Sequence, residues 1–132
     1  MKNLFVTYEQ AVALKALGFN EETFTWFLNE TDIQFGNTEN VGIDVSTNTE
    51  LTKLGCISAP LKQQVFEWFR NNHGCDVVIQ PCRVIRVDKA NGYTCMIYTP
   101  KEEIFRWNLG NIHLTYEQAE SACIDKLIEL AR

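Results

Sequence analysis

Apolar residues recur at three- and four-residue spacing in three stretches of the chain, a pattern typical of helices that bury one face. The clearest helix covers residues 114–131, and two others are predicted over residues 59–74 and residues 7–17. Gly74 and Gly18 follow the two earlier stretches, where a helix commonly ends. The apolar stripe of the last helix consists of Tyr116, Ala119, Cys123, Leu127 and Leu130. Glu120 and the other acidic residues of this helix are expected to face mainly outward.

The same five residues, Thr-Tyr-Glu-Gln-Ala, open the first predicted helix at Thr7 and the last one at Thr115. In each copy a threonine is followed three residues later by a glutamine, Gln10 or Gln118. This spacing is a capping box, in which each side chain bonds the backbone N–H of the other residue. Both helix starts are therefore predicted from local sequence alone.

Strand-forming residues dominate residues 23–28 and residues 33–35, with a turn predicted over residues 29–32 between them. We interpret this region as a short hairpin, and a second helix beginning at Asn20 is the alternative. Residues 37–58 are rich in Asn and Thr and are predicted to form a long surface loop. A loop of this length in a small domain is usually functional or mobile.

The region after Gly74 is rich in strand-forming residues. Pro81 predicts a bulge or a sheet edge, and residues 83–99 form a predicted hairpin with Asn91-Gly92 as its turn. That turn would pair Val87 with Met96 and Ile85 with Tyr98. These four residues would share the core face, whereas Arg86, Asp88, Cys95 and Ile97 would share the other. A third strand is expected over residues 103–107.

The predicted elements give a single α+β domain over residues 1–132, with helices packed on antiparallel sheet. From Ala59 on, the order is helix-strand-strand-strand-helix. In topology and length, residues 59–132 resemble the double-stranded-RNA-binding domain, which implies two helices on one face of a three-stranded antiparallel sheet. Members of that family that bind RNA have lysines at the start of the final helix. Tyr116, Glu117 and Gln118 stand there in this chain, so RNA binding is not implied.

A second resemblance covers the full length. Its residues are Tyr8-Glu-Gln-Ala11, Leu14-Lys-Ala-Leu-Gly-Phe19, Ala59-Pro60, Gln64-Val-Phe-Glu-Trp-Phe-Arg70, Thr115-Tyr-Glu-Gln-Ala119 and Ala122-Cys-Ile-Asp-Lys-Leu-Ile128. In these residues the chain resembles a set of small uncharacterised proteins from phages and prophages of Bacteroides-type gut bacteria. The matching positions are mostly core and capping residues. The resemblance implies a shared fold and a phage source, and it carries no activity.

Charge is unevenly distributed along the chain. The formal net charge is −5, and residues 1–58 hold three Lys or Arg against eight Asp or Glu, which is also −5. Residues 59–108 hold seven against five, which gives +2. A nucleic-acid surface would have to lie in this middle block, on Arg83, Arg86, Lys89, Lys101 and Arg106. Acidic residues are interspersed there, so a solvated sheet face is favoured.

No motif predicts catalysis, a metal or a cofactor. The five cysteines lack a Cys-x-x-Cys spacing, and His73, Cys75 and Cys82 come nearest to a metal pattern. Cys75 or Cys95 could form a Cys–His nucleophile pair with His73 or His113, but no local sequence motif supports such a pair. Without a secretion signal, the cysteines are expected to be reduced and mostly buried thiols of a cytoplasmic protein in a bacterial host cell. No apolar run is long enough to span a membrane.

Aromatic residues are the remaining candidates for binding. Trp68 and Trp107 could anchor a protein partner, and the helix over residues 59–74 carries Phe66, Trp68 and Phe69, which one stripe would not bury together. We therefore expect a small non-enzymatic binding protein that contacts a host or virion protein. The alternatives are a nucleic-acid-binding module that uses the Arg83–Arg106 sheet face and an enzyme of unknown type. The net charge disfavours nucleic acid.

Overall fold

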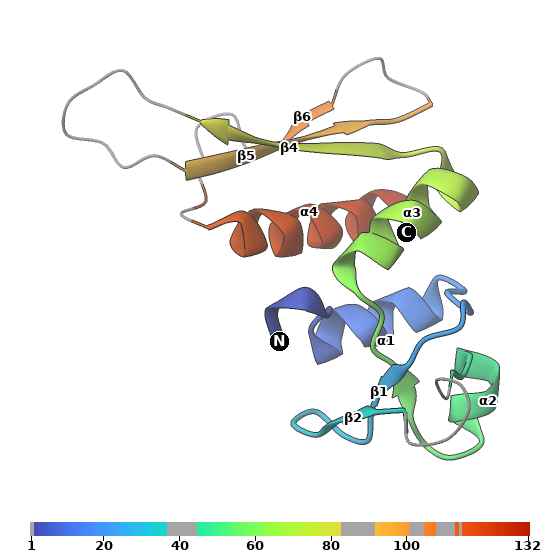
Figure 1. Cartoon of the computed structure of the whole chain (residues 1–132). Helices are drawn as coiled ribbons and strands as arrows, with labels where there is room; N and C mark the ends of the chain where they lie inside the picture. The colour runs from blue at the N-terminus through green and yellow to red at the C-terminus, as the bar shows by residue number, and fades with distance from the viewer. Residues whose placement is uncertain (1, 37–44, 83–91, 101–104, 108–112, 114) are drawn as a thin grey trace. The chain divides into compact units, whose positions relative to one another are not determined.

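The computed structural model describes residues 2–36, 45–82, 92–100, 105–107, 113 and 115–132 (Figure 1). Its helices are the 3-10 turn Lys2–Leu4 and the α-helices Tyr8–Ala16 (α1), Asn48–Thr52 (α2), Lys62–His73 (α3) and Tyr116–Ala131 (α4). Its strands are Thr25–Phe27 (β1), Ile33–Phe35 (β2), Ile57–Ser58 (β3), Asp76–Cys82 (β4), Gly92–Tyr98 (β5) and Phe105–Trp107 (β6). The predicted α+β class is confirmed.

The chain divides into two compact units. Unit 1 is Met1–Gln64 with Arg132, and unit 2 is Val65–Ala131. The boundary falls inside α3, and each unit contains one three-stranded antiparallel sheet. The prediction of a single domain over residues 1–132 stays a prediction.

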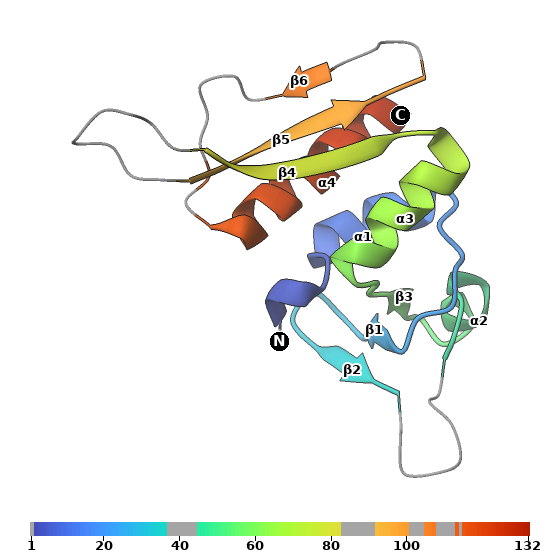
Figure 2. The same cartoon turned by 45° about the horizontal axis from the view of Figure 1, so that its top comes forward.

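The sheet of unit 1 has the order β2-β1-β3 (Figure 2). The hairpin predicted from residues 23–35 is confirmed, with Thr25 opposite Phe35 and Phe27 opposite Ile33. β3 pairs with the other edge of β1, where Trp26 lies opposite Ser58. The central strand thus comes early in the chain, and one of its neighbours arrives about thirty residues later.

Helix α1 begins and ends as its sequence predicts. The capping box is present: the Gln10 N–H donates to Thr7 Oγ1 at 3.2 Å, and the Thr7 N–H donates to Gln10 Oε1 at 3.0 Å. Gly18 has a φ of 98°, and the Phe19 N–H donates back to the Leu14 oxygen at 2.9 Å. This left-handed ending directs Phe19 into the interior, where it is buried.

The prediction of a surface loop over residues 37–58 is wrong for its described part, residues 45–58; residues 37–44 lie outside the described residues. Thr47 and Glu50 form a third capping box, which starts α2. Leu51 and Cys56 are buried, and the segment ends in β3. The sequence carried this signal, because Thr47-Asn-Thr-Glu50 has the same spacing as the other two boxes.

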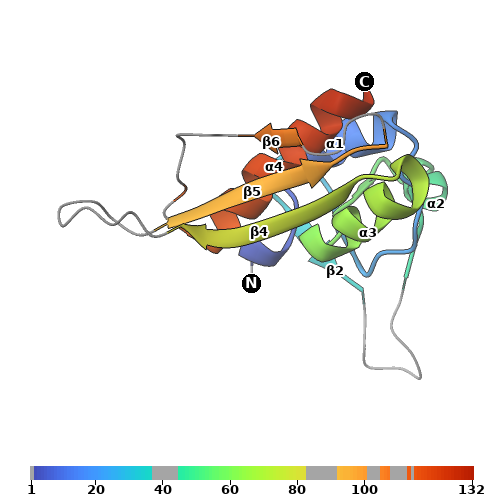
Figure 3. The same cartoon turned by 90° about the horizontal axis from the view of Figure 1, so that it is seen from above.

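Unit 2 has the predicted order helix-strand-strand-strand-helix, and its sheet has the order β4-β5-β6. Figures 1 and 3 show α3 and α4 on the same side of this sheet. Pro81 lies in β4, which is at an edge of the described sheet, as its missing N–H requires. His113 and Tyr93 exchange backbone bonds of 2.8 and 3.0 Å, which tie the chain before α4 to β5.

The predicted pairing of β5 is wrong. Met96 lies opposite Val78 on β4 and Arg106 on β6, so both of its neighbouring positions are taken. Ile85 and Val87, its expected face partners, lie outside the described residues. The predicted core face is also inverted, since Cys95 and Ile97 are buried while Met96 and Tyr98 are half-exposed. The prediction was based on the Asn91-Gly92 turn signal alone. In the structure β5 takes its register from β4, the strand that contains Pro81.

Helix α4 has the predicted capping box, with the Gln118 N–H donating to Thr115 Oγ1 at 3.1 Å. Its buried face differs from the predicted stripe and consists of Ala119, Glu120, Cys123, Ile124, Leu127 and Ile128. Tyr116 and Leu130 are 39% and 40% exposed, because they lie at the two ends of the helix. Glu120, expected to face outward, is 6% exposed. The buried face of α4 therefore consists of two adjacent rows of residues rather than one.

Helix α3 buries all three of its large aromatic residues, so the expectation that at least one would lie near the surface or under the loop over residues 37–58 is wrong in its first alternative. Phe66 and Trp68 are each 7% exposed, and Phe69 is fully buried. At 100° per residue, the positions of Val65, Phe66, Trp68 and Phe69 span an arc of roughly 160°. The buried face of α3 is therefore wider than a single stripe.

Candidate binding site

Unit 1 contains a pocket of about 220 Å³ between the N-terminal segment and the β1–β2 hairpin. Its lining comes from two stretches that are distant in sequence, Phe5 to Tyr8 and Phe27 to Ile33. The members of the lining are Phe5, Val6, Thr7, Tyr8, Phe27, Glu30, Thr31 and Ile33. Phe5, Val6 and Phe27 are buried, whereas Thr7, Glu30 and Thr31 are exposed. The pocket therefore has an apolar floor and a polar rim.

The N-terminal side of the floor is anchored by backbone and ring contacts. The Val6 N–H donates to the Pro60 oxygen at 3.2 Å, and Phe5 forms an isolated antiparallel bridge with Leu61. The Phe5 ring meets Phe24 and Phe35 edge-on, with centroids 6.0 and 5.7 Å apart. These contacts hold an N-terminal segment that contains only one short 3-10 turn.

Tyr8 forms one wall. Its ring stands edge-on to Phe27 at 5.5 Å, with an angle of 89° between the rings. Tyr8 is the first residue of α1, so the Thr7–Gln10 capping box fixes its backbone. The Thr7 N–H and Oγ1 are both used in that box. Thr7 therefore contributes shape to the rim more than hydrogen bonds to a ligand.

The opposite wall is a turn held by one side chain. Asn29 Oδ1 accepts from the Thr31 N–H at 2.9 Å, from the Asp32 N–H at 3.0 Å and from Thr31 Oγ1 at 2.9 Å. Asn29 Nδ2 donates to the Asp32 side-chain oxygen Oδ2 at 2.8 Å. The Leu28 N–H donates to the backbone oxygen of Asp32 at 2.9 Å. The turn is thereby preorganised, and Glu30 is placed at its tip.

Two polar groups of the rim remain uncommitted. Among the described residues, the Glu30 carboxylate and the Tyr8 hydroxyl have no hydrogen-bond or ion-pair partner. Glu30 is exposed, and residues 1–58 carry a formal charge of −5. The chemistry offered to a ligand is thus an apolar floor, one carboxylate and one phenol.

The size of the pocket limits its occupant. A cavity of about 150 Å³ can hold a benzene ring, whereas most small-molecule and cofactor sites occupy roughly 300–1,000 Å³. A pocket of about 220 Å³ suits one apolar side chain better than a cofactor.

This pocket was not predicted from the sequence. The Asn29 turn and the first capping box were readable locally, but nothing local brings residues 5–8 beside residues 27–33.

The binding residues predicted from sequence are placed only in part. Arg83, Arg86, Lys89 and Lys101 lie outside the described residues. Arg106 and Trp107 belong to β6, opposite Met96 and Cys95, and only their backbone is described. Trp68 is 7% exposed, with its ring 5.0 Å from both Phe69 and His73. Trp68 therefore offers little surface to a partner.

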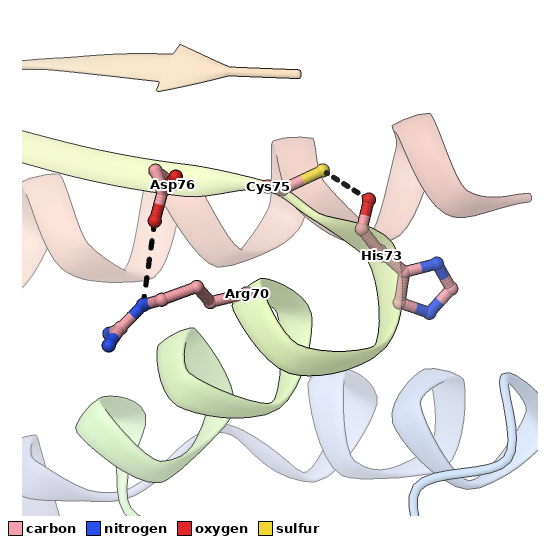
Figure 4. Close-up of polar contacts among 4 residues, drawn as sticks. All are labelled: Arg70, His73, Cys75 and Asp76. Carbon is pink, nitrogen blue, oxygen red and sulfur yellow. Dashed lines mark hydrogen bonds and ion pairs between the residues drawn. The ribbon is translucent and has the colours of Figure 1, made fainter. Parts of the chain in front are cut away.

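His73 and Cys75 do not form a nucleophile–base pair. Figure 4 shows the His73 ring directed away from the thiol, which donates instead to the His73 backbone oxygen at 3.7 Å. Burial raises the pKa of the Cys75 thiol, and the neighbouring Asp76 carboxylate raises it further. Asp76 itself forms a surface ion pair with Arg70 at 3.5 Å. A protonated thiol that faces a backbone carbonyl is a poor nucleophile.

Cys95 on β5 and Cys123 on α4 form a second thiol pair. The interaction between the two thiols lowers the pKa of Cys95 and raises that of Cys123. Burial raises the pKa of Cys123 further. The two residues are 1% and 0% exposed. Among the cysteines whose side chains are described, Cys56, Cys75, Cys95 and Cys123 are buried and free, as expected. These thiols pack as small apolar groups.

No protein-family model matches the chain, and no curated protein or solved structure shows significant similarity to it. Both sequence resemblances therefore stay predictions. Within the described ranges, no cluster of three or more His, Cys, Asp or Glu residues is arranged to hold a metal ion. No helix in the described part of the chain combines the length and apolar character that crossing a membrane requires.

Proposed function

We propose that this chain is a non-enzymatic binding protein that docks on a partner protein through the pocket of unit 1. The observation that supports the proposal is a preformed pocket with an apolar floor and two braced walls. Binding energy at protein interfaces is concentrated where a large side chain enters such a pocket. A site already fixed by internal bonds loses little conformational entropy when it is occupied.

The size and chemistry of the pocket favour a protein over a small molecule. Its volume suits one side chain, and the uncommitted polar groups of the described lining are one carboxylate, on Glu30, and one phenol, on Tyr8. The thiols of Cys56, Cys75, Cys95 and Cys123 are buried, and raised pKa values keep those of Cys75 and Cys123 protonated. The sequence resemblance to phage and prophage proteins would make the partner a host or virion protein, met in the bacterial cytoplasm.

Site-specific photo-crosslinking tests the proposal. A benzophenone amino acid replaces Thr31 on the rim or, as a matched control, Asn71, which is exposed on α3. The expected result is one host or virion protein crosslinked from position 31 and not from position 71. That protein, once purified, should bind the Ile33→Trp variant at least tenfold more weakly by calorimetry, because the larger ring fills the pocket.

Two outcomes contradict the proposal. One is equal crosslinking of the same protein from both positions. The other is unchanged affinity of the purified partner for an Ile33→Trp protein whose circular dichroism and thermal midpoint match the parent. Either result would place the contact elsewhere on the chain.

A further inference from the structure

We infer that the pocket of unit 1 accepts a branched aliphatic or single-ring aromatic side chain from a segment that carries Lys or Arg beside it. The inference rests on the proposed function and names the chemistry of its partner.

The floor selects an apolar group. Phe5, Val6 and Phe27 are 5%, 3% and 8% exposed, and they present only carbon to the pocket from their side chains. The two rim threonines already use Oγ1 in hydrogen bonds: Thr7 Oγ1 accepts from the Gln10 N–H, and Thr31 Oγ1 donates to Asn29 Oδ1. The Tyr8 hydroxyl is then the uncommitted neutral polar group of the described lining. A polar side chain that entered would lose its water without gaining equivalent bonds, which is unfavourable.

The rim selects a cation next to that apolar group. Glu30 is the charged residue of the described lining, and it has no partner within the described part of the chain. Asn29 and its four bonds hold the turn on which Glu30 is carried. The backbone that carries Glu30 is therefore already ordered, so an ion pair at this position does not have to order the turn on binding. The formal charge of −5 on residues 1–58 adds long-range attraction for a basic segment.

The expected contribution of the cation is modest. An exposed ion pair contributes about 0.2–1 kcal/mol, which corresponds to an affinity change of roughly 1.4- to 5-fold. The apolar side chain should supply most of the affinity, and the cation should supply selectivity. This division gives two separable readouts.

Nuclear magnetic resonance titration of the intact ¹⁵N-labelled chain tests the contribution of the apolar side chain and that of the cation. The probes are three acetylated and amidated peptides, Gly-Lys-Leu-Lys-Gly, Gly-Gln-Leu-Gln-Gly and Gly-Lys-Ser-Lys-Gly. At about 10 mM salt, where charges act over ~30 Å, the Lys-Leu-Lys peptide should shift the amides of Val6, Tyr8 and Ile33. It should bind about two- to fivefold more tightly than Gln-Leu-Gln, and Lys-Ser-Lys should leave these amides unshifted.

Charge variants complete the test. Glu30→Gln should reduce the difference in affinity between the Lys-Leu-Lys and Gln-Leu-Gln peptides, and about 1 M salt should abolish it. Glu21→Gln removes an exposed carboxylate outside the lining and should preserve the difference.

The failures are distinguishable. Equal binding of the two leucine peptides to the parent chain at low salt overturns the inference about the cation, while a partner crosslinked at position 31 would still support docking. Shifts of the pocket amides by Lys-Ser-Lys as large as those by Lys-Leu-Lys overturn the apolar part. Absence of any shift at these amides with all three peptides overturns the inference as a whole.

Discussion

Unit 1 and unit 2 each contain a three-stranded antiparallel sheet, but different interactions hold the two sheets together. In unit 1 the strands have three, three and two residues. Buried polar side chains supply the missing pairing: Thr25 Oγ1 donates to the Ala59 oxygen, and Thr23 Oγ1 donates to the Ser46 oxygen at 3.3 Å. Asn48 bonds two further backbone groups, those of Phe19 and Ser58.

In unit 2 the strands have seven, seven and three residues. β4 and β5 pair along their full length, and α4 covers one face of the sheet (Figure 3). The residues buried on α4 and β5 are mainly apolar, with thiols among them: Cys95, Ile97, Ala119, Cys123, Ile124, Leu127 and Ile128. The long ladder between β4 and β5 provides the backbone hydrogen bonds in this unit. The buried side chains therefore serve mainly to fill the core.

The difference between the two sheets follows from the hydrogen-bond partners that the buried backbone needs. Every buried N–H and C=O needs a partner, and a two- or three-residue strand provides few. Unit 1 meets this need with Thr and Asn, whereas unit 2 meets it with strand length. We therefore expect unit 1 to be sensitive to lost hydrogen bonds and unit 2 to lost volume. The candidate binding pocket lies in the unit with the short strands, between the start of α1 and the turn that follows β1.

The largest effect is expected from a cavity in unit 2. Leu127→Ala should lower the free energy of unfolding by about 3 kcal/mol, because a side chain that is 1% exposed is truncated. Leu130→Ala on the same helix, at a residue that is 40% exposed, should cost less than about 1 kcal/mol. Urea denaturation measures both. Equal losses would contradict the assignment of the buried face of α4.

In unit 1 the corresponding effect should come from a polar residue. Asn48→Ala leaves the Phe19 oxygen and the Ser58 N–H without their partners at 2.8 and 2.9 Å. The expected cost is about 2 kcal/mol. Asn71→Ala, at an exposed position of α3, should change stability by less than about 0.5 kcal/mol. If both substitutions prove neutral, side-chain bonds do not hold the sheet of unit 1.

The repeated capping box allows a matched comparison between the units. Thr7→Ala and Thr115→Ala each remove the acceptor for a backbone N–H and should cost about 1 kcal/mol. Thr→Ser at either position should retain most of the stability. Hydrogen exchange should locate the loss at the start of α1 in one variant and at the start of α4 in the other. Faster exchange at the same helix in both variants would argue against two separate caps.

The smallest effect has the opposite sign. Ser58 is 1% exposed, and its Oγ has no hydrogen-bond partner among the described residues. Ser58→Ala should therefore raise the free energy of unfolding by up to about 1 kcal/mol. Thr25→Val, which removes a bonded hydroxyl and leaves the Ala59 oxygen unpaired, should lower it by about 1–2 kcal/mol. A loss of stability in both variants would mean that the Ser58 hydroxyl is satisfied in solution.

Features encoded within a few residues were predictable from the sequence. The caps at Thr7 and Thr115, the left-handed ending at Gly18 and the turn over residues 29–32 depend on neighbours three or four positions apart. The edge position of Pro81 follows from its missing N–H. These signals place the helices and the first hairpin without knowledge of the rest of the fold.

Features that depend on distant segments were not predictable. The register of β5 is set by β4 and β6 together, so the Asn91-Gly92 signal alone gave the wrong partners and the wrong buried face. The burial of Glu120 depends on the width of the covered face of α4. The pocket needs residues 5–8 beside residues 27–33, and the contacts of Val6 and Phe5 with Pro60 and Leu61 help to fix its N-terminal side.

The most direct test of docking through unit 1 is hydrogen–deuterium exchange of the intact chain with and without the partner captured at position 31. The proposal predicts slower exchange at the amides of Val6, Thr31 and Ile33 in the complex, with exchange in β4 and β5 unchanged. Slower exchange confined to β4, β5 and β6, with the pocket amides unaffected, would contradict it and would move the binding surface to unit 2.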